Sequence, residues 1–341
     1  MTDAGRNWLA RRGRHSGVGH GATLLEIADG PGRGTRLLDM LAGPDLCVRV
    51  AIDRGFEIAE IHSRGNAVGW SSPVHLRAAA LQSYAEDDGL GFLRSFSGML
   101  TTCGLDHIGL PARTSAEHYG YPGRAQVSHP LHGRVAFLPA TLDGYGITEG
   151  AQGRILWAQG SVIQAMVFGE HLNLVRRIEM PLFGHRLEIL DRVENRGSRP
   201  VPHALLYHWD FGWPLLDEGV RIMMPPGKPF WCSDTARAGH DRLVAPAPTD
   251  GYGELVYAQR PLQSLTGQAE VRLDNAALGL TAVLGFRPQE LPVLLQWQAY
   301  EPGIYALGIE PATQMLGDAP ALLSPGDVRH YHQTLRLDWR D

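Results

Sequence analysis

The chain has 341 residues, of which 44% are hydrophobic and 20% charged, and its formal net charge is −5. This length is enough for one large domain or two ordinary ones, with a sizeable buried core. No basic surplus is available to neutralise phosphates, which argues against nucleic acid or an anionic membrane as a partner. We therefore expect a globular protein that binds neither nucleic acid nor an anionic membrane.

The N-terminal region and the cysteines favour a cytoplasmic location. Residues 1–20 are polar and basic, and no apolar segment follows Arg11 and Arg12, so no secretory signal is readable. No apolar run approaches the length of a membrane span. The three cysteines are far apart and form no CxxC pair, which indicates neither a disulfide framework nor a thiolate zinc site. We expect a flexible arm over residues 1–20, a single domain over residues 21–341, and no cofactor.

The side-chain pattern predicts many strands and few helices. Residues 74–84 are the best candidate for a helix because they are rich in alanine. Residues 186–195, 280–286, 293–299 and 331–339 read as strands separated by Gly, Pro, Asn and Asp. Gly and Pro are abundant and spread along the chain, which suits many turns. We therefore expect an all-β fold, a large antiparallel β-sandwich with few short helices.

Residues 203–214 combine histidines, an aspartate and several aromatic rings within twelve positions. Aromatic faces stack on the C–H faces of sugars, while His and Asp form hydrogen bonds with hydroxyl groups. Pro200 and Pro202 are expected to break the pairing of the strand that precedes this segment. The composition favours a carbohydrate site, although an aromatic core corner with buried histidines would have the same composition.

The segment 303–311 is predicted to be a strand that presents a carboxylate. Side chains alternate along a strand, so its bulky apolar residues share one face and Glu310 lies on the other. The residues before Glu310 on that second face are as small as Gly308, which leaves room for a ligand. Pro311 has no N–H to donate and is expected to end the strand pairing.

A third segment, residues 129–134, contains His132 and Arg134 two positions apart. In an extended chain they share a face, where both can donate hydrogen bonds to hydroxyl or carboxylate oxygens. A loop with an arginine on the surface would explain the same residues.

Together these segments resemble the galactose-mutarotase-like superfamily, the aldose 1-epimerases in the wide sense. Residues 191–197 and 207–213 are similar to the strand, Asn-Gly turn and histidine loop of that family. The other similar segments are Leu131-His132-Gly133, Ile309-Glu310-Pro311 and Ser324-Pro325-Gly326-Asp327. The chain resembles more narrowly the bacterial DUF4432 subgroup, through Asp53-Arg54-Gly55, Trp70-Ser71-Ser72-Pro73, residues 98–104, Pro130-Leu131-His132-Gly133-Arg134 and Phe211-Gly212-Trp213-Pro214. The resemblance implies the supersandwich fold of the superfamily and a sugar or sugar derivative as the ligand.

The resemblance also implies roles for individual side chains. Glu310 would be the general base that removes the proton of the anomeric hydroxyl, and His208 the general acid that protonates the ring oxygen. His132 would bind a sugar hydroxyl. The further candidates for substrate binding are Arg134, Asp210, Arg54, Arg94 and Trp70. Arg54 and Arg94 are candidates because the arginine segment of the family has no clear match, and Trp70 is as consistent with packing as with stacking.

The chain departs from the pattern of the family at the centre of the site. Tyr207 stands where the family has Asn before the histidine, and residues 209–212 also differ. The pocket is therefore expected to be reshaped, and the sequence does not identify the sugar or say whether it carries phosphate or carboxylate. Trp297, on an apolar strand face, is expected to lie in the core.

Two other functions stay open at this point. A metal-dependent sugar isomerase or lyase would need several histidines to converge with Glu310 around a divalent ion. The histidines available for this are His107, His129, His132, His203 and His208. A non-catalytic sugar-binding module would need the aromatic rings and His132 but not Glu310. The sequence does not decide whether the protein is a homodimer.

Overall fold

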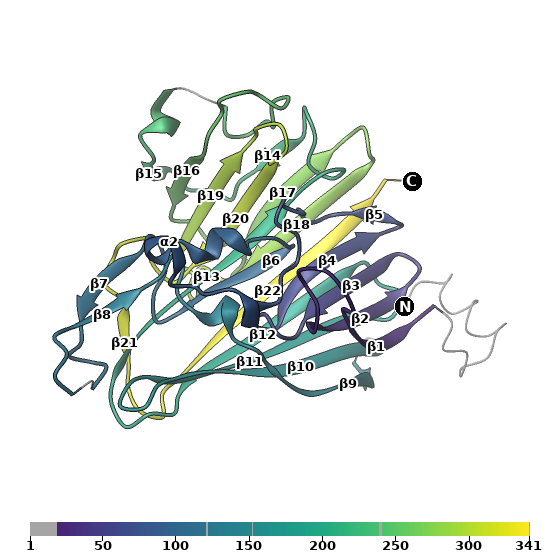
Figure 1. Ribbon diagram of the computed structural model, residues 1–341. Coiled ribbons are helices and arrows are strands. Elements are labelled where there is room, and N and C mark those ends of the chain that lie inside the picture. The colour runs from purple at the N-terminus through teal and green to yellow at the C-terminus, as the bar shows by residue number, and fades with distance from the viewer. Residues whose placement is uncertain (1–18, 121, 152, 239–240, 341) are drawn as a thin grey trace.

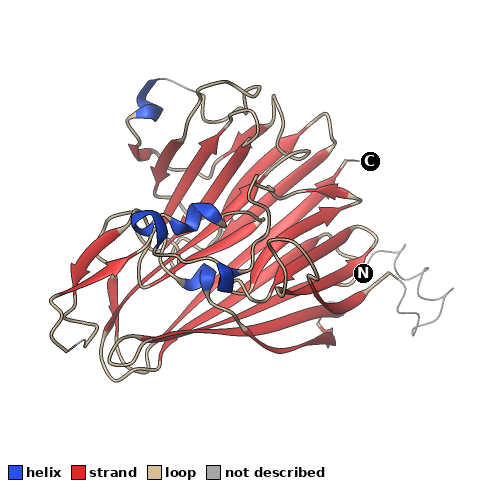
Figure 2. Ribbon diagram, viewed as in Figure 1, coloured by secondary structure: helices blue, strands red, loops and turns tan. Residues whose placement is uncertain are grey.

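Antiparallel strands joined by turns make up most of the regular structure, as Figure 2 shows in red. The computed structural model describes residues 19–120, 122–151, 153–238 and 241–340. The predicted N-terminal arm lies outside the described residues except for positions 19 and 20. Within the described part of the chain, no helix is long and apolar enough to cross a membrane.

The larger of the two main sheets has twelve strands, most of them in the order β1-β2-β3-β4-β6-β13-β20-β19-β16-β15. We call it the large sheet (Figure 1). Its strands are β1 (Gly21–Glu26), β2 (Arg36–Gly43), β3 (Leu46–Ala51), β4 (Glu57–Ser63), β5 (Asn66–Ala67), β6 (Leu100–Leu105), β13 (Val201–Phe211), β15 (Pro229–Cys232), β16 (Leu255–Gln259), β19 (Val293–Ala299), β20 (Ala306–Ala312) and β21 (Ala321–Leu323).

The other main sheet has eight strands in the order β14-β17-β18-β22-β12-β11-β10-β9. They are β9 (Thr141–Gly150), β10 (Gly153–Ala165), β11 (His171–Pro181), β12 (Arg186–Asn195), β14 (Arg221–Met223), β17 (Ala269–Asn275), β18 (Leu280–Phe286) and β22 (Val328–Trp339). A small separate sheet pairs β7 (Ala112–Ser115) with β8 (Gln126–His129). The short helices are η1 (Ala79–Leu81), α2 (Glu86–Gly89), η2 (Gly91–Arg94), η3 (Val135–Phe137) and η4 (Thr235–Ala238). The predicted antiparallel β-sandwich is confirmed, and β12, β18, β19 and β22 occupy or extend the predicted strands.

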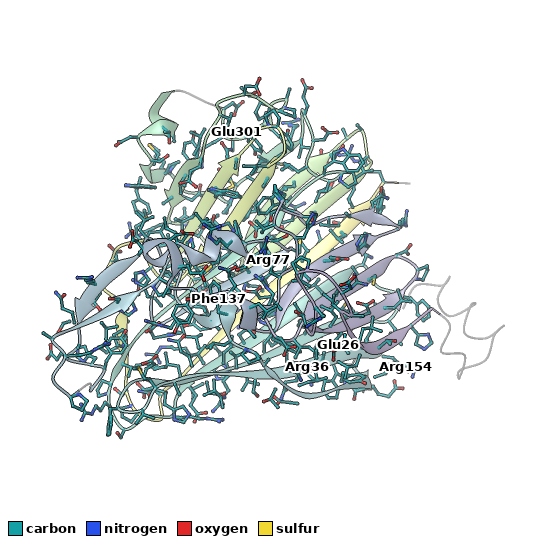
Figure 3. The ribbon with its side chains drawn as sticks, in the orientation of Figure 1. Glu26, Arg36, Arg77, Phe137, Arg154 and Glu301 are labelled. Carbon is teal, nitrogen blue, oxygen red and sulfur yellow. The ribbon has the colours of Figure 1, made fainter. Side chains whose placement is uncertain are left out.

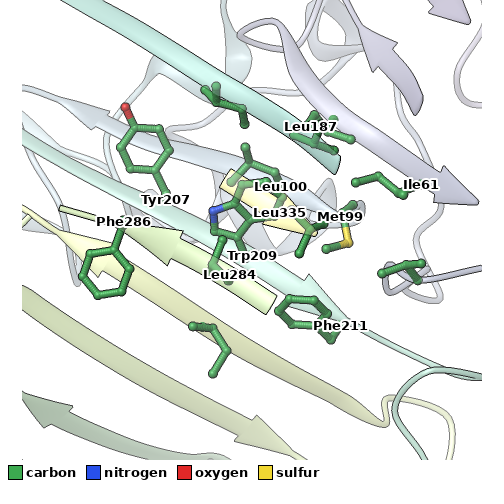
Figure 4. Close-up of a cluster of buried hydrophobic side chains, with 14 of the residues drawn as sticks. Ile61, Met99, Leu100, Leu187, Tyr207, Trp209, Phe211, Leu284, Phe286 and Leu335 are labelled. Atoms are coloured by element: carbon green, nitrogen blue, oxygen red, sulfur yellow. The ribbon is translucent and has the colours of Figure 1, made fainter. Parts of the chain in front are cut away.

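The main core lies between the two large sheets. Alternate residues of β13, namely Tyr207, Trp209 and Phe211, point into it together with residues of β18 and β22 (Figure 4). The indole N–H of Trp209 donates a 2.8 Å hydrogen bond to Gln333 of β22, which satisfies its buried donor. This packing holds β13 in place at the centre of the large sheet.

A second apolar cluster covers the opposite face of the large sheet, which we call the site face. It includes Trp70, Phe92, Phe96, Leu131 and Trp297, with small residues of β6, β13 and β20 beneath them. Figure 1 shows α2 and the neighbouring short helices lying over this part of the sheet. Figure 3 shows Arg77 and Phe137 in the same layer of loops and helices in this view. Because both faces of β13 and β20 are covered, every residue of β20 is buried and so are nearly all residues of β13.

Two local predictions were wrong. Only η1, over Ala79–Leu81, forms within residues 74–84, since so short a segment is marginal as a helix without an apolar face to pack. Residues 207–211, which resemble the histidine loop of the family, lie in β13, and Pro202 pairs with Leu322 of β21 inside that strand. The prediction of one domain over residues 21–341 stays a prediction.

The expected end of pairing at Pro311 was also wrong. Pro311 pairs with Leu294 of β19, and β20 continues to Ala312. The ladder between β20 and β13, in contrast, has no registered partner for Pro311. A proline loses only one N–H, so it interrupts the bonding to one neighbouring strand and not to both.

Candidate active site

Strand register brings His208 and Glu310 together. The antiparallel pairing matches Leu206 with Ala312 and Trp209 with Ile309, so His208 of β13 lies opposite Glu310 of β20. Both side chains point to the site face, because their strand neighbours point into the main core. His208 Nε2 lies 3.2 Å from Glu310 Oε1. The carboxylate is therefore where the alternation along β20 predicted it, with the imidazole beside it.

A cavity of about 580 Å³ opens over these two side chains. Five of its lining residues have a charged, imidazole or hydroxyl side chain: Ser72, His132, His208, Glu254 and Glu310. The others are Trp70, Pro73, Val74, Leu90, Phe92, Leu93, Phe96, Gly109, Leu110, Leu131, Val256, Trp297, Ile304 and Leu316. A concave, mostly apolar cavity with a few converging polar groups is typical of a small-molecule site.

His208 lies between two carboxylates. Its Nδ1 is 2.6 Å from Asp210 Oδ1, which is buried beneath it on the same face of β13. Burial disfavours the charged imidazolium, but Asp210 and Glu310 outweigh burial and raise the pKa of His208 to about 9. An imidazole with this pKa is protonated at neutral pH and can supply a proton from Nε2.

Burial has the opposite effect on the two carboxyl groups. It raises the pKa of Glu310 to about 7, although the positive charge of His208 lowers this pKa. It raises the pKa of Asp210 to about 6, again against the lowering effect of His208. Glu310 is therefore poised near neutrality, where a general base is most effective.

Gly308 makes the close approach of His208 and Glu310 feasible. It lies on the site face of β20, two residues before Glu310. A Cβ atom at this position would lie 2.8 Å from Glu310 Oε1 and 2.9 Å from His208 Cε1, and both distances are shorter than real Cβ contacts. The small residue that the sequence pattern singled out leaves room for the histidine–glutamate pair itself, beneath the ligand cavity.

His132 enters the cavity from a tightly bonded loop. Its backbone has φ +57°, and Gly133 follows with φ +76°. A Cβ atom at position 133 would lie 2.3 Å from the carbonyl oxygen of Gly104, so this position requires glycine. The N–H of Gly109 donates a 3.4 Å hydrogen bond to His132 Nδ1. Burial and the charge of His208 lower the pKa of His132 to about 3. The ring is therefore neutral, with the proton on Nε2 and available to a ligand oxygen.

Aromatic rings enclose His208. The ring centroid of Phe96 lies 4.8 Å away and that of Trp297 5.6 Å away, both edge-on to the imidazole. Trp70 packs against Phe96 and Trp297 and also lines the cavity. The expectation that Trp297 is a core residue was wrong in part, because the loops over the site face leave one side of its ring at the cavity.

Sequence reasoning missed Glu254. It directly precedes β16 and accepts a 2.9 Å hydrogen bond from the indole N–H of Trp297. Its carboxylate lines the cavity. Burial is the main cause of the raised pKa of Glu310, and the negative charge of Glu254 raises this pKa further. The only local signal was an acidic residue before a short apolar strand, which is too common to single out.

The structure does not bring all the predicted substrate ligands to the cavity. Arg54 is buried, with Nε 3.4 Å from Glu57, and Arg134 reaches Asp106 at 3.3 Å, so both are engaged in ion pairs elsewhere. Neither lines the cavity, which corrects the prediction of their role. Arg94 lines an adjoining hollow, where it pairs with Asp87.

Asp210 needs a different correction. It lies behind His208 and contacts the imidazole, so it does not line the cavity as a direct ligand would. The position of Asp210 relative to His208 follows from strand alternation, but which of the two faces the ligand depends on the loops above them.

The histidines do not converge as a metal site would require. His203 bonds to the carbonyl oxygen of Leu105 and to the hydroxyl of Tyr331, and His129 bonds to Thr114. Of the five histidines considered, only His132 and His208 line the cavity. Among the described residues, no three His, Cys, Asp or Glu side chains are arranged to hold a metal ion.

The sequence matches a known protein family. Residues 32–331 match the family model described as Domain of unknown function (DUF4432). The chain belongs to the DUF4432 family. None of the curated proteins matches the sequence.

Solved structures with the same fold as this DUF4432 protein include a putative aldose 1-epimerase from Klebsiella pneumoniae, at 24% identity and a TM-score of 0.83. The match covers 93% of this chain and 84% of that one. A galactose mutarotase-like protein from Clostridium acetobutylicum matches at 14% identity and TM-score 0.65, over 94% and 99% of the two chains. Galactose 1-epimerase from Lactobacillus acidophilus matches at 10% identity and TM-score 0.60, over 94% and 100%. The DUF4432 protein therefore has the galactose mutarotase-like sandwich fold.

Proposed function

We propose that this DUF4432 protein is a sugar mutarotase, an aldose 1-epimerase-like enzyme that interconverts the anomers of a reducing sugar. The observation that carries the proposal is the placement of His208 between Asp210 and Glu310, with Nε2 and the Glu310 carboxylate at the cavity. The structural neighbours named as aldose 1-epimerase and galactose 1-epimerase support the same class of reaction.

The reaction needs an acid and a base at one carbon atom of the sugar. The anomeric hydroxyl and the ring oxygen are both bonded to C1, so neighbouring donor and acceptor groups can reach them together. Glu310 takes the hydroxyl proton, and His208 gives a proton to the ring oxygen as the bond from C1 to that oxygen breaks. The open-chain aldehyde then rotates about the C1–C2 bond and closes with the proton transfers reversed, which yields the other anomer.

The remaining contacts would position the sugar. The Nε2–H of neutral His132 can donate to a hydroxyl, and Glu254 can accept from one. Trp70 and Trp297 offer apolar surface to the C–H faces of the ring. Asp210 acts through His208, whose orientation and charge it stabilises.

Exchange spectroscopy by NMR tests the proposal directly. The rate of anomer exchange would be measured across a panel of aldoses, ketoses and uronates, for wild type, Glu310→Gln and His208→Asn. We expect acceleration of at least one sugar by wild type and a loss of about 10²- to 10⁴-fold in each variant. Glu270→Gln, in an exposed ion pair on β17, is the matched control and should retain full activity.

Three results would contradict the mutarotase proposal. If wild type accelerates the anomer exchange of none of the sugars, the proposal is overturned. Saturable sugar binding without exchange would favour a binding module instead. Activity that EDTA removes and a divalent ion restores would favour a metal-dependent isomerase or lyase.

A further inference from the structure

We propose that the substrate is an uncharged 6-deoxy sugar, in which the exocyclic carbon C6 is a methyl group. This inference rests on the proposed function, because the mutarotase chemistry sets which end of the sugar meets His208 and Glu310. The substrate class follows from the charges, hydrogen-bonding groups and apolar walls of the cavity.

The charges in the cavity disfavour an anionic sugar. Glu254 and Glu310 line the cavity, and the buried carboxylate of Asp210 lies behind His208. Among the described residues, the cavity lining contains no lysine or arginine. A phosphate or carboxylate on the sugar would enter a largely desolvated site with no cation besides His208, which two carboxylates already contact. Burial of such an unpaired charge is costly.

Nearby arginines do not offset these charges. Arg94 and Arg77 line an adjoining hollow, which shares Val74, Leu90 and Leu93 with the cavity. Arg94 is paired with Asp87 in that hollow, and Arg77 donates from Nε to the carbonyl oxygen of Val74. In these contacts neither guanidinium group lines the cavity.

The hydrogen-bonding groups are too few for a fully hydroxylated hexose. Glu310 and His208 are occupied by the anomeric hydroxyl and the ring oxygen, which leaves His132, Glu254 and Ser72 among the polar side chains. One oxygen of Glu254 already accepts from the indole of Trp297, and Ser72 Oγ accepts from the N–H of Val74. A hexose has a hydroxyl on almost every ring carbon and another on C6. Each one buried without a partner weakens binding by roughly tenfold or more.

The surroundings of His208 indicate which hydroxyl is absent. C6 is attached to C5, which is bonded to the ring oxygen, so C6 lies near the imidazole that protonates that oxygen. Phe96 and Trp297 flank this imidazole, with ring centroids 4.8 and 5.6 Å from it. A methyl group on C5 would pack against these rings, whereas a hydroxymethyl group in the same place would lose its hydrogen bonds to water.

The mouth of the cavity is also apolar. Leu93, Leu110 and Ile304 line the cavity and remain 54%, 75% and 38% exposed. Exposed apolar residues that gather around one opening indicate a binding surface rather than a solvated rim. Entry of a sugar with fewer hydroxyl groups costs less desolvation at such an opening.

Matched sugars that differ only at C6 test this inference. For the galacto ring these are D-galactose, D-fucose, L-arabinose and D-galacturonate. Corresponding sets on the gluco and manno rings, in both enantiomers, cover the other configurations. Affinity would be measured by quenching of tryptophan fluorescence and anomer exchange by NMR. In at least one configuration we expect the 6-deoxy sugar to bind about tenfold more tightly than the hexose, with no measurable binding of the uronate.

The outcomes separate the substrate inference from the proposed function. Exchange of a hexose or uronate at least as fast as its 6-deoxy partner in every set overturns the inference and leaves the mutarotase standing. Preferred binding of a 6-deoxy sugar without exchange overturns the mutarotase, and with it the assignment of that sugar as a substrate, and leaves the 6-deoxy sugar as a ligand of the cavity. Absence of binding by every sugar overturns the inference.

A single substitution tests the charge argument separately. Glu254→Gln should raise the affinity for the uronate relative to the 6-deoxy sugar, because it removes a carboxylate from the cavity. Glu270→Gln, on the exposed surface, should leave this ratio unchanged. A ratio that Glu254→Gln does not move would contradict the role assigned to the cavity charges.

Discussion

Asp210 Oδ1 lies 2.6 Å from Nδ1 of His208, two residues away on the same face of β13. The opposite nitrogen of the same ring lies 3.2 Å from Glu310 on β20. Asp210 thus contacts Nδ1 of the imidazole, while Glu310 lies beside Nε2 and lines the cavity together with His208. This arrangement makes Asp210 a positioning residue and leaves Nε2 as the nitrogen that meets a ligand.

The titration of these groups predicts a bell-shaped pH profile for kcat/KM. Glu310 acts as a base only when it has lost its proton, so activity should rise with pH through its pKa of about 7. His208 acts as an acid only when protonated, so activity should fall as pH passes its pKa of about 9. The expected maximum lies between the two values, and stopped-flow polarimetry across pH 5 to 11 would locate both limbs.

Asp210→Asn should shift both limbs of this profile to lower pH, because the carboxylate of Asp210 raises the pKa of Glu310 as well as that of His208. The carboxylate of Asp210 favours the imidazolium, so its loss lowers the pKa of His208 and shifts the alkaline limb to lower pH. Unchanged limbs with a uniformly lower rate would mean that Asp210 does not act through the charge of His208.

Gly308→Ala should disrupt the pair without unfolding the strand. The added methyl would lie 2.8 Å from Glu310 Oε1 and 2.9 Å from His208 Cε1, so one of the side chains must move. We expect kcat to fall about 10²-fold, as displacement of reacting groups by about an ångström does. The matched control is Gly146→Ala on β9, where the nearest atom to the new methyl is 3.9 Å away. Equal activity in both variants would contradict the proposed geometry.

His132→Asn should weaken substrate binding without altering the pH profile. Asn tolerates the φ of +57° at this position, so the loop can keep its shape. Loss of the Nε2–H donor should raise KM by about tenfold. The pKa of His132 is lowered to about 3, so its removal takes no titration out of the working range. A change in either limb would indicate that His132 transfers protons.

Asp191→Ala should destabilise the protein far more than removal of a surface charge. Arg176 donates to Asp191 from Nη2 at 2.7 Å, Tyr207 donates to the same carboxylate at 2.7 Å, and all three side chains are buried. Loss of the carboxylate leaves a buried guanidinium unpaired, at a cost of about 3–5 kcal/mol. Urea unfolding would measure this, with Glu270→Ala expected to change stability by about 1 kcal/mol or less.

Strand alternation explains why so much of the fold could be predicted from local pattern. β12, β18, β19 and β22 each alternate or are apolar throughout, and turn residues separate them, so their limits follow from short-range chemistry. The prediction of a helix over residues 74–84 failed because so short a segment is marginal as a helix even when it is rich in alanine.

Some features of the candidate site could likewise be predicted from the local sequence, and others depend on the tertiary structure. The sequence by itself determined that Glu310 lies on the face of β20 that carries small residues, because period-two alternation is a property of any strand. Only the tertiary structure decided that His208 faces Glu310, since register between strands about a hundred residues apart depends on packing of the whole sheet. The assignment of Glu254 and Trp297 to the cavity, and of Arg54 and Arg134 to ion pairs elsewhere, was decided in the same way. The contacts of a side chain depend on which loops fold against it, and the spacing of residues along the chain does not specify these contacts.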